Sequence, residues 1–157
     1  MIRPLAEAEY AAWMDDVVPG YAADKVASGA WREDEALEKS REEYHALLPQ
    51  GRVTPDNHLY SIDDDEGRHV GVLWIAVQSR GAERIGYVYD LMVWPAHQRR
   101  GHAERAMREA EDEARRLGLV GIALHVFGHN KAARALYEKL GYEPTNLNLY
   151  KPLPPTP

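Results

Sequence analysis

The spacing of hydrophobic residues along the chain changes near residue 58. Before this point, residues 7–18 and 33–48 carry apolar side chains three and four positions apart, which is the spacing of one face of an α-helix. Pro19 predicts the end of the first helix and Pro49 the end of the second, because proline disrupts the helical backbone. The N-terminal third of the chain is therefore predicted to contain two helices.

After residue 58 the pattern becomes that of β-strands. Residues 59–62 and 70–77 are rich in branched and aromatic side chains, and a polar turn at residues 63–67 separates them, which predicts a β-hairpin. A third, long strand is predicted over residues 85–94, where Pro95 stops it. Together these segments predict an antiparallel meander.

The remaining sequence alternates helices with strands. Residues 101–117 predict a helix with apolar residues on one face and ion pairs on the other, and Gly118 ends it. A strand over residues 120–127, a helix over 130–140 and a last strand over 142–150 follow. The whole order predicts a mixed α/β (α+β) fold with a central, mostly antiparallel sheet flanked by helices.

Length and composition fit a single folded domain. The chain has 157 residues, of which 45% are hydrophobic and 28% charged, so it can bury a core and is not expected to be disordered. The domain is predicted over residues 1–151. The proline-rich residues 152–157 are predicted to form an extended tail.

Charge and cysteine content exclude several classes of function. The 19 Lys and Arg residues face 25 Asp and Glu residues, and the net charge of −6 argues against a nucleic-acid partner. No apolar run approaches the roughly 20 residues that span a bilayer, so no membrane partner is expected. The absence of cysteine excludes disulfides, thiolate metal sites and covalent catalysis by a thiol. We expect a cytoplasmic protein.

The turn between the third predicted strand and the helix that follows has the chemistry of an anion site. The first N–H groups of a helix have no intrahelical partners and carry the positive end of the helix dipole. Gly101 leaves these groups uncovered, and Arg99 and Arg100 add positive charge. Such a turn can bind phosphate. An ordinary polar helix start is the alternative.

Two runs of residues resemble the GCN5-related N-acetyltransferase (GNAT) family. Residues 98–103 match its Gln/Arg-x-x-Gly-x-Gly/Ala signature, and residues 130–142 resemble its second motif, Asn-x-x-Ala-x-x-Leu-Tyr-x-x-x-Gly-Phe/Tyr. The resemblance covers about residues 58–150, and it departs at His102, where the family more often has an aliphatic residue. It implies a GNAT-like fold in which the sheet splays into a V.

The resemblance also implies the co-substrate, acetyl-CoA, and the residues that would bind it. The diphosphate would lie on main-chain amides of the first motif, and the pantetheine would pair with the third predicted strand as an added strand does. A β-bulge would free an amide, expected at Met92, to face the thioester oxygen. The residues expected to bind acetyl-CoA are Leu91, Met92, Val93, Gln98, Arg99, Arg100, Gly101, His102, Ala103, Asn130 and Ala133. Asn130 is also expected to cap its own helix.

Two residues are expected to be catalytic. By resemblance, Tyr137 protonates the departing CoA thiolate, although its position on the helix alone is that of a core tyrosine. Asp90 is expected to be the base that accepts the proton of the attacking amine, and a strand-end carboxylate that holds a loop is the other interpretation. His125, Glu83 or a chain of water molecules are alternative bases.

The sequence thus predicts an N-acetyltransferase that moves an acetyl group from acetyl-CoA to a primary amine by direct attack in a ternary complex. The amine belongs to a small molecule or a peptide, and a non-catalytic module that binds CoA or a protein is the alternative. No metal is expected, because His125 and His129 have no third ligand nearby in the sequence. Trp13 and Trp31 are assigned mainly to core packing. A homodimer through sheet edges or the last strand is a further expectation.

Overall fold

The computed structural model describes residues 1–156, which fall into two compact units. The first unit, Met1–His125, contains the sheet and three α-helices, and the second begins at Val126 and contains one α-helix. Within the described residues, no helix is both long and apolar enough to cross a membrane.

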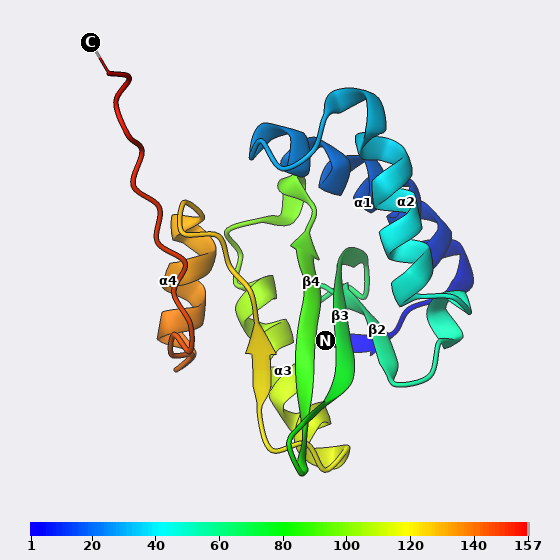
Figure 1. Cartoon of the computed structure of the whole chain (residues 1–157). Helices are drawn as coiled ribbons and strands as arrows, with labels where there is room; N and C mark the ends of the chain where they lie inside the picture. The colour runs from blue at the N-terminus through cyan, green and yellow to red at the C-terminus, as the bar shows by residue number, and fades with distance from the viewer. Residues whose placement is uncertain (157) are drawn as a thin grey trace. The chain divides into compact units, whose positions relative to one another are not determined.

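A five-stranded sheet forms the centre of the first unit (Figure 1). Its strands are β1 (Ile2–Pro4), β2 (Asn57–Asp63), β3 (His69–Arg80), β4 (Glu83–Val93) and β5 (Ile122–Leu124), and they lie side by side in this order. Neighbouring strands are antiparallel, except that β4 and β5 are parallel. The predicted hairpin, the meander and the mostly antiparallel sheet are therefore confirmed.

Helices cover both faces of this sheet. The helical elements are α1 (Glu7–Ala27), α2 (Glu33–Leu47), α3 (His102–Arg116), α4 (Lys131–Lys139) and two short 3₁₀ helices, η1 (Gly51–Val53) and η2 (Pro95–His97). The first two α-helices pack on one face of the sheet, and α3 packs on the other (Figure 1). The predicted mixed α/β class is confirmed, and the helices expected over residues 33–48, 101–117 and 130–140 are all present.

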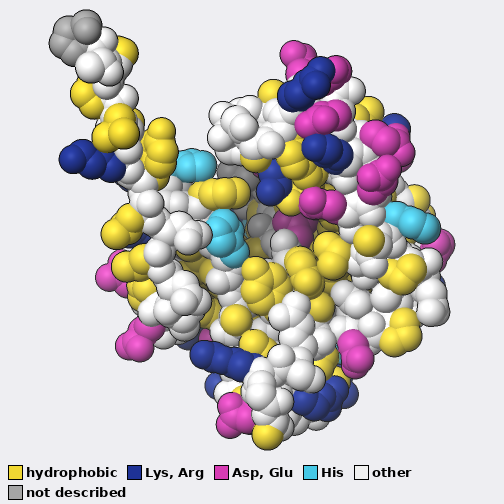
Figure 2. Space-filling model, viewed as in Figure 1, with side chains coloured by type: hydrophobic (Ala, Val, Ile, Leu, Met, Phe, Trp, Pro, Cys, Tyr) yellow, Lys and Arg dark blue, Asp and Glu magenta, His cyan; other side chains and the backbone are white. Residues whose placement is uncertain are grey.

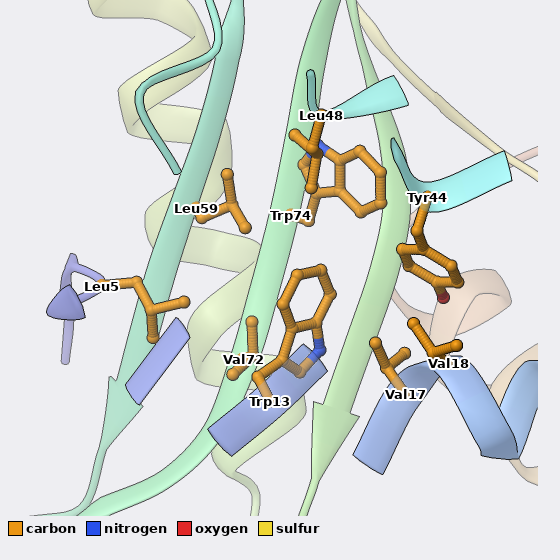
Figure 3. Packing of buried hydrophobic residues seen from close by; sticks show 9 residues of the cluster. All are labelled: Leu5, Trp13, Val17, Val18, Tyr44, Leu48, Leu59, Val72 and Trp74. Carbon is orange, nitrogen blue, oxygen red and sulfur yellow. The ribbon is translucent and has the colours of Figure 1, made fainter. Parts of the chain in front are cut away.

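The core beneath α1 and α2 is built around aromatic rings. Trp13 of α1 and Trp74 of β3 are each 1% exposed, and their ring centroids lie 5.8 Å apart in an edge-to-face arrangement. Tyr44 of α2 contacts both rings, at 6.0 and 6.1 Å. Figure 3 shows these rings among aliphatic side chains. The cluster consists of Leu5, Trp13, Val17, Val18, Tyr44, Leu48, Leu59, Val72 and Trp74.

The first helix continues through Pro19, so the prediction that it ends there is wrong. Proline removes one helical hydrogen bond, but Val17 and Val18 before it and Ala22 after it are all buried. The hydroxyl of Ser40 on α2 also donates a hydrogen bond to the carbonyl of Val18, at 2.7 Å. Packing on both sides of the proline therefore outweighs its local cost.

The two ends of the chain differ from the prediction. Strand β1 was not predicted, and it pairs with β2 at residues 60–62. Strand β5 is shorter than the predicted strand over residues 120–127. The last strand, predicted over residues 142–150, does not form, and Leu147 and Leu149 there are exposed. A strand needs a partner for its backbone groups, and the described part of the second unit offers only α4.

Candidate active site

A β-bulge interrupts the pairing of β3 with β4 at Tyr89. Trp74 lies opposite Asp90, and the next residue, Ile75, lies opposite Val88, so Tyr89 has no partner of its own. Because one extra residue changes the side to which the following side chains point, Asp90 lies on the same face as Trp74. The bulge therefore turns the carboxylate toward the layer of α1 and α2.

The bulge also marks the point where β4 and β5 separate. Strand β5 pairs with β4 only at Gly86, Tyr87 and Val88. Among the described strands, none pairs with this side of β4 at residues 89–93. The V that the resemblance implies is therefore present, and the opening runs along the C-terminal part of β4.

The backbone of Met92 points toward β3 and not toward this opening. The N–H of Trp94 donates to the carbonyl of Val70, at 2.9 Å, and hydrogen-bonded pairs alternate along an antiparallel ladder, so Met92 and Val72 form the next such pair. A Cβ added to Gly71 would collide with the Met92 carbonyl oxygen, which agrees with this direction.

The same alternation turns the backbone groups of Leu91 and Val93 toward the opening. The side chain of Gln98 donates to the Val93 carbonyl at 2.9 Å, so this carbonyl is accessible from that side. The prediction of a free amide at Met92 is therefore corrected, because the bulge lies at Tyr89 and shifts the alternation. The outward-facing backbone groups are those of Leu91, whose N–H donates to the Asp90 carboxylate, and of Val93.

The turn after β4 leads through η2 to the start of α3. Gly101 is the N-cap residue, its φ of +80° is in the left-handed region, and an added Cβ would meet nothing within 4 Å. The N–H of Arg105 is bonded to the Gly101 carbonyl, at 3.0 Å, so the N–H groups of His102, Ala103 and Glu104 precede the first helical bond. The predicted amide-rich helix start is present.

Two arginines add positive charge at this helix start. Arg99 and Arg100 are exposed, and neither has an ion pair or hydrogen bond within residues 1–156. His102 differs from them because it is buried, with its Nδ1 3.3 Å from Nη2 of Arg105. Arg105 in turn bonds the Asp65 carboxylate at 2.6 Å. His102 thus packs inward at a position where the family more often has an aliphatic residue.

Asp90 is the carboxylate that lies nearest along the chain to the outward amides. Its Oδ2 accepts a hydrogen bond from Nε1–H of Trp13 at 3.0 Å, and the N–H of Leu91 also donates to the carboxylate. Burial raises the pKa of Asp90 to about 6, because it excludes water from the charged form, and the two hydrogen bonds limit the rise. The carboxylate is ionised at neutral pH and binds a proton more readily than an exposed aspartate.

The alternative bases lie at different places on the sheet. Glu83 is exposed and begins β4, seven residues before Asp90, which corresponds to about 23 Å of strand. His125 directly follows β5, one residue beyond the pair of Leu124 and Val88, and therefore lies level with the bulge. Asp90 is the candidate that combines burial, a raised pKa and a position on the open part of β4.

The second unit holds the remaining predicted residues. Asn130 caps α4, because its Oδ1 accepts a hydrogen bond from the N–H of Ala133 at 3.2 Å, and the expected capping role is confirmed. Tyr137 is partly buried on α4, with its ring 5.6 Å from that of Tyr142. Contact of Asn130 and Ala133 with acetyl-CoA, and the acid role of Tyr137, stay predictions.

Sequence patterns place Trp13 in the core, but they do not reveal its hydrogen bond to Asp90. The two residues are 77 positions apart, and no local signal connects them. The extra residue Tyr89 was also not located. It lies in a run of apolar and aromatic residues whose pattern is the same for a regular strand and for a bulged one.

Comparison with known proteins identifies the family. Residues 21–142 match the model of the acetyltransferase (GNAT) family. An uncharacterized N-acetyltransferase of Bacillus subtilis, YdgE, is 33% identical over 152 residues, which are 97% of each chain. The crystal structure of the acetyltransferase YycN, also from Bacillus subtilis, has a TM-score of 0.90 at 32% identity and covers 99% of both chains. The chain therefore belongs to the GNAT family of acetyltransferases.

The same fold extends to more distant structures. An acetyl transferase from Pyrococcus furiosus has a TM-score of 0.70 at 23% identity and covers 98% of this chain and 99% of its own. At that identity the likeness concerns the fold alone.

Proposed function

We propose that the protein transfers an acetyl group from acetyl-CoA to a primary amine by direct attack in a ternary complex. One arrangement carries the proposal. A partly buried carboxylate, the open edge of β4 and a positively charged helix start follow one another within fifteen residues, from Asp90 to Glu104. The family makes acetyl transfer the expected chemistry.

The start of α3 suits the diphosphate of CoA. Gly101 leaves space beside the first amides of the helix, and those amides carry the positive end of the dipole. Arg99 and Arg100 are not neutralised by any described side chain. A doubly charged diphosphate would supply the anions that these groups lack.

The open edge of β4 suits an extended chain with amide groups, such as pantetheine. Leu91 and Val93 present backbone groups to the opening, and β5 does not cover them. A ligand that pairs there would extend the sheet in the manner of an added strand. Because the Leu91 N–H already donates to the Asp90 carboxylate, the Val93 amide is the one that would stabilise negative charge developing on the thioester oxygen.

Asp90 is the proposed base. Acetyl-CoA, when bound, supplies a thioester whose carbonyl carbon forms the new C–N bond as its C–S bond breaks. The amine arrives as an ammonium ion, and Asp90 takes up its proton before or during the attack. The absence of cysteine leaves direct attack as the simplest route, because no thiol can carry the acetyl group.

Tyr137 is the proposed acid for the departing thiolate, and this role rests on the family motif. The phenol has an ordinary pKa of about 10 and a thiol about 8.5, so a hydrogen bond to the thiolate matters as much as complete proton transfer. In each turnover the nitrogen of the ammonium ion loses two protons on becoming an amide: one reaches the CoA thiol, and the other leaves to solvent from the base.

Two measurements test the proposal. Thiol release from acetyl-CoA across a panel of amines measures turnover, and the enzyme adds no background because it has no cysteine. Calorimetry with CoA measures binding to the Arg99→Ala/Arg100→Ala double variant, for which we expect a loss of about tenfold in affinity. The control is Arg115→Ala/Arg116→Ala at the other end of α3. No affinity of the wild type for CoA, or equal losses in both variants, would overturn the proposal.

A further inference from the structure

Within residues 1–156, the carboxylate of Asp90 has no positively charged partner. Its hydrogen bonds come from the neutral indole of Trp13 and the amide of Leu91, and no Lys or Arg of the described residues forms an ion pair with it. A partly buried carboxylate without a counter-charge is costly, and an oppositely charged ligand relieves that cost.

Two tyrosines line the same face of the sheet beside this carboxylate. The ring of Tyr89 stacks on that of Trp74, with centroids 4.6 Å apart and planes 27° apart, and Tyr87 lies 4.9 Å from Tyr89. Tyr89 is 37% exposed, although Trp74 beneath it is 1% exposed. Gln78 donates a hydrogen bond to the Tyr89 hydroxyl at 3.1 Å and orients the ring. The bulge therefore places an exposed aromatic surface next to Asp90.

We infer that Tyr87, Tyr89 and Asp90 form the site that binds the acceptor. The acceptor of this site carries one positively charged amine attached to an aromatic or apolar group. This inference rests on the proposed function, because it names the substrate class of that site. The faces of the tyrosine rings attract the ammonium group by cation–π interaction and pack against the apolar group of the acceptor, and the carboxylate of Asp90 pairs with the charged nitrogen. Removal of the proton then occurs where the amine is held.

The other end of the aromatic cluster explains why one charge is favoured over several. The rings continue through Tyr44 to Tyr21 and Trp31. Lys25 lies 5.3 Å from the Tyr21 centroid and 5.4 Å from the Trp31 centroid, and Lys39 lies 5.9 Å from the Trp31 centroid. Those aromatic rings already hold cations of the protein. A second ligand cation extended in that direction would find these ring faces occupied by Lys25 and by Lys39, which is itself paired with Glu35 at 2.8 Å, and this disfavours polyamines and aminoglycosides.

Figure 2 shows that hydrophobic side chains gather across the middle of the face shown. Basic and acidic side chains lie together at the upper right, over the ends of α1 and α2.

The test uses benzyltrimethylammonium, a cation that cannot be acetylated, and benzyl alcohol as a neutral counterpart. Calorimetry on the full chain without acetyl-CoA should show binding of the cation and at least tenfold weaker binding of the alcohol. Tyr89→Leu and Asp90→Asn should each weaken binding of the cation by about tenfold, and Tyr89→Phe should change it by less than about threefold. The control is Tyr150→Leu, which alters an exposed tyrosine of the second unit.

Several results would overturn the inference: no binding of the cation to the wild type, unchanged binding to Tyr89→Leu, or tighter binding of spermine than of benzyltrimethylammonium. A CoA titration of the same samples separates the two proposals and shows that the variants are folded. If CoA binds and the cation does not, the acceptor site is wrong and the proposed function stands. If CoA does not bind, the proposed function itself fails.

Discussion

The indole N–H of Trp13 holds the carboxylate of Asp90 at 3.0 Å, although the two residues are 77 positions apart in the chain. The tryptophan is 1% exposed and is wedged between Tyr44 and Trp74, so its donor has a fixed direction. Helix α1 therefore does more than cover the sheet. It determines the orientation and the proton affinity of the proposed base.

Replacing Trp13 with Phe should raise the pKa of Asp90 above its value of about 6. The indole hydrogen bond favours the charged carboxylate, so its loss favours the neutral form, by about one pKa unit. The inflection in a plot of log kcat/KM against pH should move upward accordingly. Trp31→Phe is the matched control, because Trp31 packs on Tyr21 and makes no bond to Asp90. An unmoved inflection in Trp13→Phe would show that Asp90 is not the titrating base.

Asp90→Asn should lower kcat/KM roughly 10- to 1,000-fold at neutral pH and abolish the inflection near pH 6. Rates should be measured from pH 5 to 9 with one amine. Retention of the inflection in this variant would assign the base to another group, with His125 as the next candidate.

The same variant should be more stable than the wild type at pH 7. The pKa of Asp90 is about 6 in the folded state and 3.8 as a reference, so the folded state binds the proton more tightly and stability falls as the pH rises from 4 to 6. Ionisation of Asp90 in the folded state lowers the free energy of unfolding by an amount on the order of 3 kcal/mol. The difference in Tm between Asp90→Asn and the wild type should grow over this pH range and then level off. A constant difference would contradict the raised pKa.

Gly101→Ala should weaken CoA binding beyond its effect on folding. The φ of +80° strains any residue with a Cβ by about 1–2 kcal/mol, and the methyl group would occupy the space beside the free amides. Gly118→Ala, at the other end of α3, has a similar φ of +73° and open space around it. Both variants should lose similar Tm, but only Gly101→Ala should lose affinity for CoA in calorimetry. Equal affinities would place the diphosphate elsewhere.

Tyr137→Phe should reduce kcat roughly 10- to 1,000-fold and leave the KM for acetyl-CoA little changed, because only the hydroxyl is removed. Tyr150→Phe is the control, since Tyr150 is 89% exposed. Initial rates at saturating amine provide the comparison. Turnover at the wild-type level in Tyr137→Phe would remove the acid assignment and leave the family unchanged.

Local patterns were sufficient for most of the fold and for the amide-rich turn before α3. The amphipathic spacing of α3 and the glycine that starts it are encoded within a few residues. Three features depended on contacts between distant segments. Burial on both sides of Pro19 extends α1, pairing with β2 creates β1, and the predicted last strand lacks a partner in its unit. Propensity cannot reveal such contacts, because they arise only when the segments meet.

The site shows the same division. Asp90 and Gly101 could be named as candidates from the sequence, because their residue types and their places at the end of a strand and the start of a helix suit a base and an anion site. The sequence could not show whether the backbone amide that faces the opening belongs to Met92 or to one of its neighbours. It depends on the position of one unpaired residue, Tyr89, and both registers are compatible with the same hydrophobic pattern.

Because Tyr89 is unpaired, the alternation of side chains between the two faces of the sheet reverses within β4. Before Tyr89, the side chains follow one alternation, and after it they follow the opposite one. If Tyr89 paired with Trp74 in a regular ladder, the register would shift by one residue, and the Asp90 side chain and the backbone groups that follow it would point to the opposite sides. The direction of the proposed base is thus fixed by leaving one residue out of the pairing, and the same residues with none left unpaired would turn Asp90 away from Trp13.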